Sequence, residues 1–173
     1  MLLRIIRFKE AVMKKMKVAL AIVALLAVVL ISVAFLDKGE LKYTNSPYYE
    51  EMDDIFVFNT REGLDDYIKM NNEKYLLDVD SVEYNSFVEL TNDYNEKYFE
   101  KKDLAVIRVN KGTGSCKFSL EDVEYEDGNL LVTIKTYYGR EYVDHILTGF
   151  HVIVEIDKLE GFKNAEFRSV GGK

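Results

Sequence analysis

The sequence contains few of the residues that cross-link a domain or interrupt its secondary structure: its 173 residues include one cysteine and one proline. It also contains no tryptophan. The single cysteine, Cys116, excludes an intramolecular disulfide, so the fold has to be stable through packing alone. Cys116 begins an apolar alternation with Phe118 and Leu120, which predicts a buried small side chain rather than a reactive thiol. The sequence also has no internal repeat and no low-complexity tract.

The motifs of nucleophilic and phosphate chemistry are missing as well. No G-x-S-x-G segment occurs, and nothing around Cys116 resembles a Cys–His nucleophile. The glycines of Gly112–Ser115 stand between two expected strands, so they predict a turn and not a phosphate-binding loop, which would open a helix. Carboxylates are so numerous that no pair of them stands out. We therefore assign no catalytic residue and expect a protein that is not an enzyme.

Histidine is scarce too, because His145 and His151 are the only two in the chain. A zinc site needs three or four converging ligands, and the spacing of these two lacks the tight H-E-x-x-H pattern. His151 alternates with Phe150 and Val152, which we expect to face the core. The pattern therefore places His151 on the surface or packed on the second face of its strand, and it predicts no zinc site.

One acidic segment, Asp78–Glu89, partly echoes a calcium-binding loop. The fifth position of such a loop should be Asp or Asn and the sixth should be Gly, but the sequence has Val82 and Glu83 there. We interpret the segment as a solvated acidic loop, and we expect neither a metal nor a cofactor anywhere in the chain.

One long apolar run does stand out, residues 18–36 (VALAIVALLAVVLISVAFL), without charge, proline or glycine. As a helix it would be about 28 Å long, close to the hydrocarbon core of a bilayer. The run is apolar all round, which argues against a buried core helix with one polar face. A cleaved signal peptide is the alternative, but its best cleavage site, Ser32–Ala34, lies inside the run. We expect an uncleaved transmembrane anchor in the lipid bilayer.

The charges on either side of this run predict its orientation. Residues 1–17 contain six Lys or Arg and one Glu, whereas the rest of the chain contains 17 basic and 29 acidic residues, a net charge of −12. Because Lys and Arg stay on the cytoplasmic side, we expect a single-pass protein with a cytoplasmic N-terminus and with residues 37–173 outside the cytoplasm. Met13 and Met16 are alternative starts that would leave a shorter basic lead.

The chain is therefore expected to have four parts: a basic cytoplasmic lead (1–17), the anchor (18–36), a tether (37–54) and an extracytoplasmic domain (55–173). The tether is polar, contains Pro47 and shows no regular period. A domain so acidic is a poor binder of nucleic acid, because phosphate contacts need clustered Lys and Arg. It suits a cationic partner or a divalent metal instead.

The hydrophobic period within the domain changes from helical to alternating at about residue 103. Before that point we expect a first strand at 55–58 and two helices, at 61–71 and 86–99. After it we expect strands, with a bulge near Glu121–Asp122 and a hairpin at Asp127–Gly128. These strands cover residues 104–109, 116–125, 130–138, 150–156 and, at an edge, 165–170, with a long connection at 139–149. The pattern predicts an α+β fold, two helices followed by an antiparallel sheet that curls into a sandwich or half-barrel.

Four segments of the domain carry a family resemblance: 98–107 (YFEKKDLAVI), 112–115 (GTGS), 127–134 (DGNLLVTI) and 151–156 (HVIVEI). In this order they resemble the PrcB-like C-terminal domain, found in exported bacterial proteins with lipid or helical anchors and named after a protease-complex subunit. The resemblance covers about residues 95–157, and the chain departs from it at 142–145 (YVDH), where a Thr-x-Asp-Met-like segment is expected. It implies an accessory role beside an exported protease or envelope assembly, and it supplies no catalytic residue.

The sequence thus predicts a non-enzymatic, membrane-anchored module that binds or steadies another protein of the bacterial cell envelope. Its acidic loops leave a second hypothesis open, a module that binds a small ligand or a divalent metal. A third, an envelope hydrolase, would have to use one of the two histidines as its base.

Overall fold

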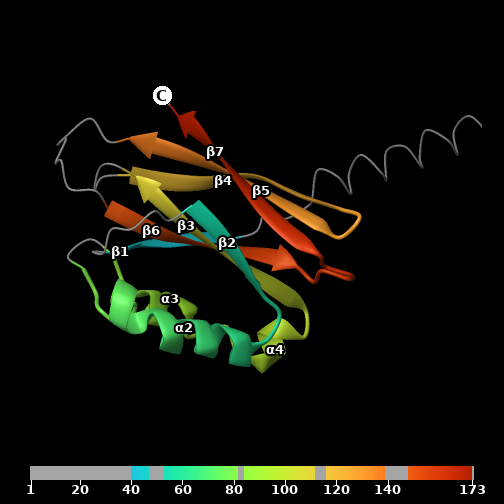
Figure 1. Ribbon diagram of the computed structural model, residues 1–173, viewed down its shortest axis with the longest axis horizontal. Coiled ribbons are helices and arrows are strands. Elements are labelled where there is room, and N and C mark those ends of the chain that lie inside the picture. The colour runs from blue at the N-terminus through green and yellow to red at the C-terminus, as the bar shows by residue number, and fades with distance from the viewer. Residues whose placement is uncertain (1–39, 47–52, 82–83, 112–115, 139–147, 173) are drawn as a thin grey trace, which may run out of the picture. The chain divides into compact units, whose positions relative to one another are not determined.

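Two β-sheets make up the body of the domain, and short helices lie against one of them (Figure 1). The computed structural model describes residues 40–46, 53–81, 84–111, 116–138 and 148–172. Within these residues the elements are, in order, β1 (Leu41–Ser46), β2 (Asp53–Phe58), α2 (Arg61–Tyr75), α3 (Phe87–Thr91), α4 (Glu96–Phe99), β3 (Lys102–Lys111), β4 (Cys116–Glu126), β5 (Asn129–Tyr138), β6 (Thr148–Asp157) and β7 (Asn164–Gly172).

Sheet A is the four-stranded sheet, with the strand order β1-β6-β3-β2 and antiparallel pairing throughout. Sheet B has the order β4-β5-β7. The two sheets pack face to face over one apolar core, to which Phe150 of β6 and Ile134 of β5 contribute. The fold is β-rich with few helices, which is consistent with the sandwich that the sequence predicted.

The central strands of sheet A are apolar on both faces because both faces are covered. Along β6, Phe150 and Val152 face sheet B, whereas Ile153 packs with Leu104 and with the helix residue Leu64 on the other side. All of these side chains are fully buried. A strand covered on both sides reads as a continuous apolar run, which is how β3 was predicted, whereas β6 was predicted from the alternation of Phe150, Val152, Val154 and Ile156 on one face.

Sheet B confirms two local predictions. The register of β4 against β5 shifts between Leu120 and Asp122, at the predicted bulge. The hairpin turns at Asp127 and Gly128, whose φ angles are +52° and +86°. Two consecutive positive φ angles are what a two-residue hairpin of type I′ requires, and Asp-Gly is among the sequences that adopt it most readily.

The helical layer differs from its prediction in two respects. Helix α2 begins after Thr60, as predicted, where the Thr60 side chain accepts a hydrogen bond from the Gly63 amide, but it runs to Tyr75 instead of ending at 71, and Leu76 caps it with a left-handed φ of +52°. The second predicted helix, 86–99, is instead two short helices, α3 and α4. The chain breaks between them because Asn95 caps α4 and because Arg61 takes up the carbonyls of Thr91 and Tyr94.

Two strands also correct the prediction. Strand β1 lies within the stretch 37–54 that we expected to be a tether, so the strand at 55–58 is the second and not the first. On the side that faces the helices, strand β1 carries Lys42, Thr44 and Ser46. Because these residues are polar, β1 lacks the alternating apolar pattern of a buried strand. Strand β7 is at the predicted edge, but it runs parallel to β5, so sheet B is mixed rather than antiparallel.

The predicted anchor, 18–36, and the basic lead, 1–17, lie outside the described residues. In the described part of the chain, no helix has both the length and the apolar character needed to cross a membrane. The predicted turn at 112–115, the connection at 139–147 with His145, and residues 82–83 also fall outside the description.

Candidate functional site

A row of polar side chains crosses sheet A on the side that faces the helices. Strand register places Thr44 of β1 opposite His151 of β6, His151 opposite Arg108 of β3, and Arg108 opposite Asp54 of β2. We call these four residues the polar row. Apolar core clusters lie on both faces of sheet A around the polar row, so these four residues stand out as polar side chains in an apolar setting.

His151 is completely buried within this row. Its Nε2 lies 3.1 Å from the Tyr67 hydroxyl of α2, and the rings of Tyr75 and Phe87 stand at 5.6 and 5.3 Å. Burial, reinforced by the positive charge of Arg108, lowers the pKa of His151 from 6.5 to about 3. The imidazole is therefore neutral at physiological pH, and no surface of it is open to a substrate.

Arg108 is the positively charged member of the polar row. Its guanidinium forms a two-point ion pair with the Asp54 carboxylate, in which Nε donates to Oδ1 at 2.6 Å and Nη2 donates to Oδ2. Nη1 donates to the Tyr75 hydroxyl at 2.8 Å, and the guanidinium carbon lies 4.8 Å from the Phe56 ring centre. The hydrogen bond to Asp54 raises the pKa of Arg108. This arrangement satisfies a charge inside a mostly apolar layer.

Tyr67 and Thr44 fasten the row to the elements above it. Burial raises the pKa of the Tyr67 hydroxyl well above its usual range, with the opposite charges of Arg108 and Asp54 as smaller, opposing influences. The Thr44 hydroxyl donates to the Asn85 carbonyl at 2.7 Å. These contacts hold α2 and the segment before α3 against the sheet, so the polar row stabilises the packing of the helical layer on sheet A.

A second polar group secures the opposite end of the helical layer. Tyr94 donates to Glu155 at 3.1 Å, and Lys102 lies 3.4 Å from the other oxygen of the same carboxylate. Asp103, which is buried, accepts from Lys158 at 2.7 Å and from the Leu159 amide at 2.9 Å. Each charge here is matched within the cluster, so this group too is built to hold elements together.

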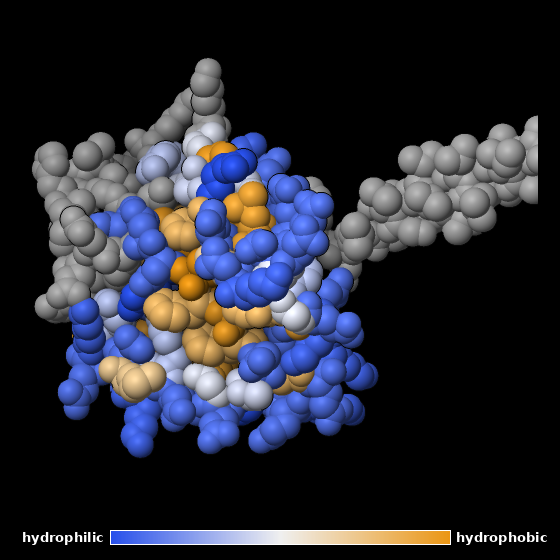
Figure 2. Space-filling model, turned by 45° about the vertical axis from the view of Figure 1, so that its right-hand side comes forward, coloured by the Kyte–Doolittle hydropathy of each residue, from blue (hydrophilic) through white to orange (hydrophobic). Residues whose placement is uncertain are grey.

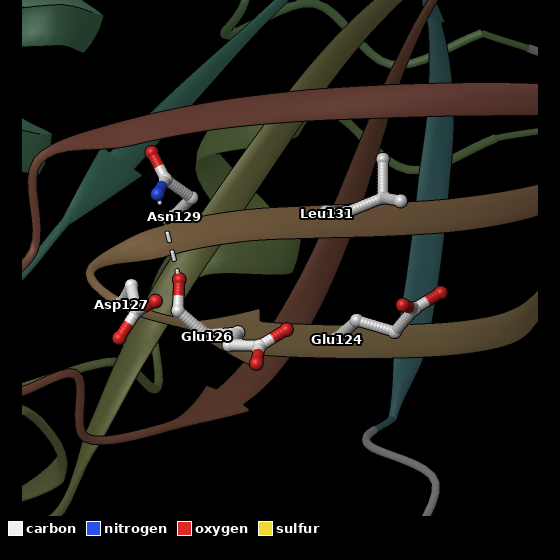
Figure 3. Close-up of a pocket in the computed structure, with 5 residues that line it drawn as sticks. All are labelled: Glu124, Glu126, Asp127, Asn129 and Leu131. Carbon is white, nitrogen blue, oxygen red and sulfur yellow. Dashed lines mark hydrogen bonds between the residues drawn. The ribbon is translucent and has the colours of Figure 1, made fainter.

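The outer face of sheet B presents a different chemistry. Near the β4–β5 hairpin a hollow of about 290 Å³ is lined by Glu124, Glu126, Asp127, Asn129 and Leu131. Figure 3 shows the two glutamates on β4 and Asn129 and Leu131 on the neighbouring β5. The dashed line in Figure 3 marks the hydrogen bond that the Asn129 side-chain amide donates to the Glu126 carbonyl, at 3.5 Å. The hollow is open, acidic and edged by one leucine.

The residues singled out in the sequence are scattered over the structure. Cys116 is buried, as predicted. The prediction for His151 is confirmed in its second form, since the ring packs on the far face of its strand and not at the surface. In the acidic segment 78–89, Asp80 accepts a hydrogen bond from the Ser86 amide at 2.7 Å, which ties the carboxylate to the chain itself. Within the described residues, no three His, Cys, Asp or Glu side chains are grouped so that they could hold a metal ion.

Sequence reasoning missed the Arg108–Asp54 pair. One signal was available, because Arg108 is a charged residue inside the apolar segment LAVIRV. A charge in a buried strand needs a partner. Which carboxylate supplies it depends on the pairing of β2 with β3, which the sequence does not display.

No family model matches the chain, and no curated protein or solved structure matches it either. The resemblance to the PrcB-like domain therefore stays a prediction based on the four segments quoted above.

Proposed function

We propose that this chain is a non-enzymatic, membrane-anchored, extracytoplasmic domain that binds or steadies another protein of the cell envelope. The observation that carries the proposal is the unequal covering of the two sheets. The described helices all pack on sheet A, whereas the described chain places no helix on the outer face of sheet B. A sheet face of this kind is available to a partner.

The composition of that outer face indicates which partner it fits. Beside the hollow, strand pairing brings Glu124 next to Leu131 and Leu131 next to Glu166. Carboxylates around a half-buried aliphatic side chain complement a basic protein surface with an apolar centre. The net charge of −12 on residues 18–173 acts in the same direction, because it steers cationic partners toward the domain.

Two further arguments support the location and the role. The apolar run 18–36, preceded by six Lys or Arg, is typical of a single-pass anchor with its C-terminal part outside the cytoplasm. The resemblance to the PrcB-like family points to accessory proteins beside an exported protease complex.

Site-specific cross-linking tests the proposed surface. A photo-reactive amino acid at position 131 of the full chain, in its native membrane, should capture one dominant envelope protein. The same amino acid at position 70 is the control, because Met70 is 75 % exposed but lies on the helix-covered side. Equal capture at both positions, or capture of many unrelated proteins, would contradict the proposal.

Charge reversal sharpens the same test. The double change Glu124→Lys and Glu126→Lys should abolish capture at position 131, whereas Asp66→Lys on the exposed side of α2 should leave it unchanged. Protease added to cells stripped of their wall tests the location separately. The domain should be digested there. A domain that is protected in such cells or in right-side-out vesicles would have the reverse of the proposed orientation.

The acidic loops of the sequence leave one second candidate, a module that binds a divalent cation. Glu124, Glu126 and Asp127 carry carboxylates at the hollow, but no three His, Cys, Asp or Glu side chains of the described residues are grouped so that they could hold a metal ion. A rise in the melting temperature of the full chain at millimolar calcium, absent in Glu126→Gln, would support this candidate. An unchanged melting temperature would remove it and leave the protein-binding proposal standing.

A further inference from the structure

We propose that a second copy of this chain pairs with the free edge of β7, so that two β4-β5-β7 sheets join into one continuous sheet across a two-fold axis. The strands β7 and β7′ would run antiparallel. This interface is distinct from the hollow on the outer face of sheet B, and it does not depend on the envelope partner proposed above.

Strand β7 is the less protected of the two edges of sheet B in the described part of the chain. The other edge of sheet B, β4, carries the bulge after Leu120 and the charges Glu121 and Asp122, which discourage pairing. Strand β7 pairs with β5 over nine residues without a register shift, and it contains neither proline nor lysine. Natural proteins usually block such a regular edge unless it is used.

The charges of β7 are self-complementary in one register. If Phe167 of one copy lies opposite Phe167 of the other, antiparallel pairing places Glu166 opposite Arg168 twice, once on each side of the axis. Within the described chain, neither of these two side chains forms an ion pair or a hydrogen bond, and both are exposed. Their charges are therefore available to a neighbouring molecule.

The apolar surroundings of β7 fit the same occupant. Strand β2 lies beside β7 where the two sheets meet, and Ile55, Val57 and Phe167 are only partly buried there. Figure 2 shows apolar surface running between two polar margins on one side of the molecule. A second copy paired along β7 would cover part of this apolar surface and satisfy the backbone groups of the strand at the same time.

Charge exchange tests the register. In sedimentation experiments on the full chain in mild detergent, Arg168→Glu should raise the dissociation constant of the dimer about tenfold, because both ion pairs become repulsive. The double change Glu166→Arg and Arg168→Glu should restore dimerisation, because it only reverses the direction of each pair. Lys117→Glu, an equal charge change on β4, is the control and should have no effect.

Disulfide trapping provides a second readout. It reports on β7 itself, whereas association through the N-terminal part of the chain would not place these cysteines opposite each other. A copy with Glu166→Cys mixed with a copy with Arg168→Cys should cross-link, because directly opposed Cβ atoms lie about 5 Å apart. Each variant with itself should cross-link far less, because its cysteines would lie diagonally, about 7 to 8 Å apart. A monomeric full chain, failure of the double charge exchange to restore pairing, or equal yields in all mixtures would overturn the proposal.

Discussion

On the outer face of sheet A, helices cover a polar row in which nearly every charge and hydroxyl has a partner. On the outer face of sheet B, carboxylates stand around a leucine, and no described helix lies above them. In both sheets these side chains come from strands whose residues alternate between the two faces. On sheet A the polar residues specify how α2 docks, because Arg108 and His151 have to meet Tyr75 and Tyr67 of that helix. On sheet B they stand at an open surface, where we propose that another protein binds. Polar residues of one fold would then stabilise helix packing in one place and contribute to recognition in another.

The largest difference should appear when the same substitution is made on the two outer faces. Leu104→Ala on sheet A removes a fully buried side chain beneath the helices, and we expect it to lower the free energy of unfolding by about 3 kcal/mol. Leu131→Ala on sheet B should cost less than about 1 kcal/mol, because its side chain is only partly buried. Urea unfolding of the full chain measures both, and equal losses would refute the contrast.

The next largest effect should come from the ion pair of the polar row. Arg108→Ala leaves the Asp54 carboxylate without its partner and the Tyr75 hydroxyl without its donor, so we expect a loss of about 2 to 3 kcal/mol. Lys117→Ala, on the exposed side of β4, should change the free energy of unfolding by no more than about 0.5 kcal/mol. If the two variants unfold at the same urea concentration, the row does not stabilise the fold as described.

Two glycines sharpen the comparison within sheet B. A Cβ atom at Gly128 would come within 2.6 Å of the Gly161 carbonyl oxygen, and the backbone there has a positive φ of 86°. Gly128→Ala should therefore destabilise the hairpin and the loop packed on it by about 2 kcal/mol. Gly171→Ala meets nothing within 4 Å and should be nearly neutral. A tolerated alanine at position 128 would show that the loop can move away without loss.

The effect that should appear most gradually is a pH slope that belongs to His151. Because burial lowers the pKa of His151 to about 3, the unfolded chain binds a proton below its own pKa of about 6.5 that the folded chain does not bind. The stability should thus be complete above pH 6.5 and fall toward pH 3, by up to about 1.4 kcal/mol per pH unit.

The variant His151→Gln isolates this contribution. Its unfolding free energy should decline less steeply with falling pH than that of the natural chain. Denaturation curves at several pH values between 7 and 4 measure the difference. A slope that survives His151→Gln unchanged would assign the acid sensitivity to the carboxylates instead.

Local patterns predicted those parts of the fold that depend on local physics. The bulge after Leu120, the turn at Asp127–Gly128 and the start of α2 at Thr60 each follow from residues close together in the chain. Strand β1 was not predicted, because its buried residues Thr44 and Ser46 are hydroxyl residues and give no apolar signal. Their hydroxyls are satisfied by hydrogen bonds to the carbonyls of Asn85 and Tyr75.

Features that depend on contacts between distant segments were out of reach. The break between α3 and α4 requires Arg61, some 30 residues earlier in the chain. The parallel direction of β7 depends on how the segment after β6 crosses the hairpin, where the Lys163 amide donates to the Gly128 carbonyl at 2.8 Å. The polar row likewise exists only once four strands are in register, so no window of sequence contains it.

The pairing of β1 with β6 has a mechanical consequence. Figure 1 shows the end of β7 at the opposite end of the sandwich from the start of β1. Tension applied between those two points would slide β1 along β6, so the six residue pairs from Leu41↔Val154 to Ser46↔Gly149 would share the load simultaneously instead of opening one after another. The first described strand is thus placed as a shear clamp, suited to a domain that is pulled from its two ends.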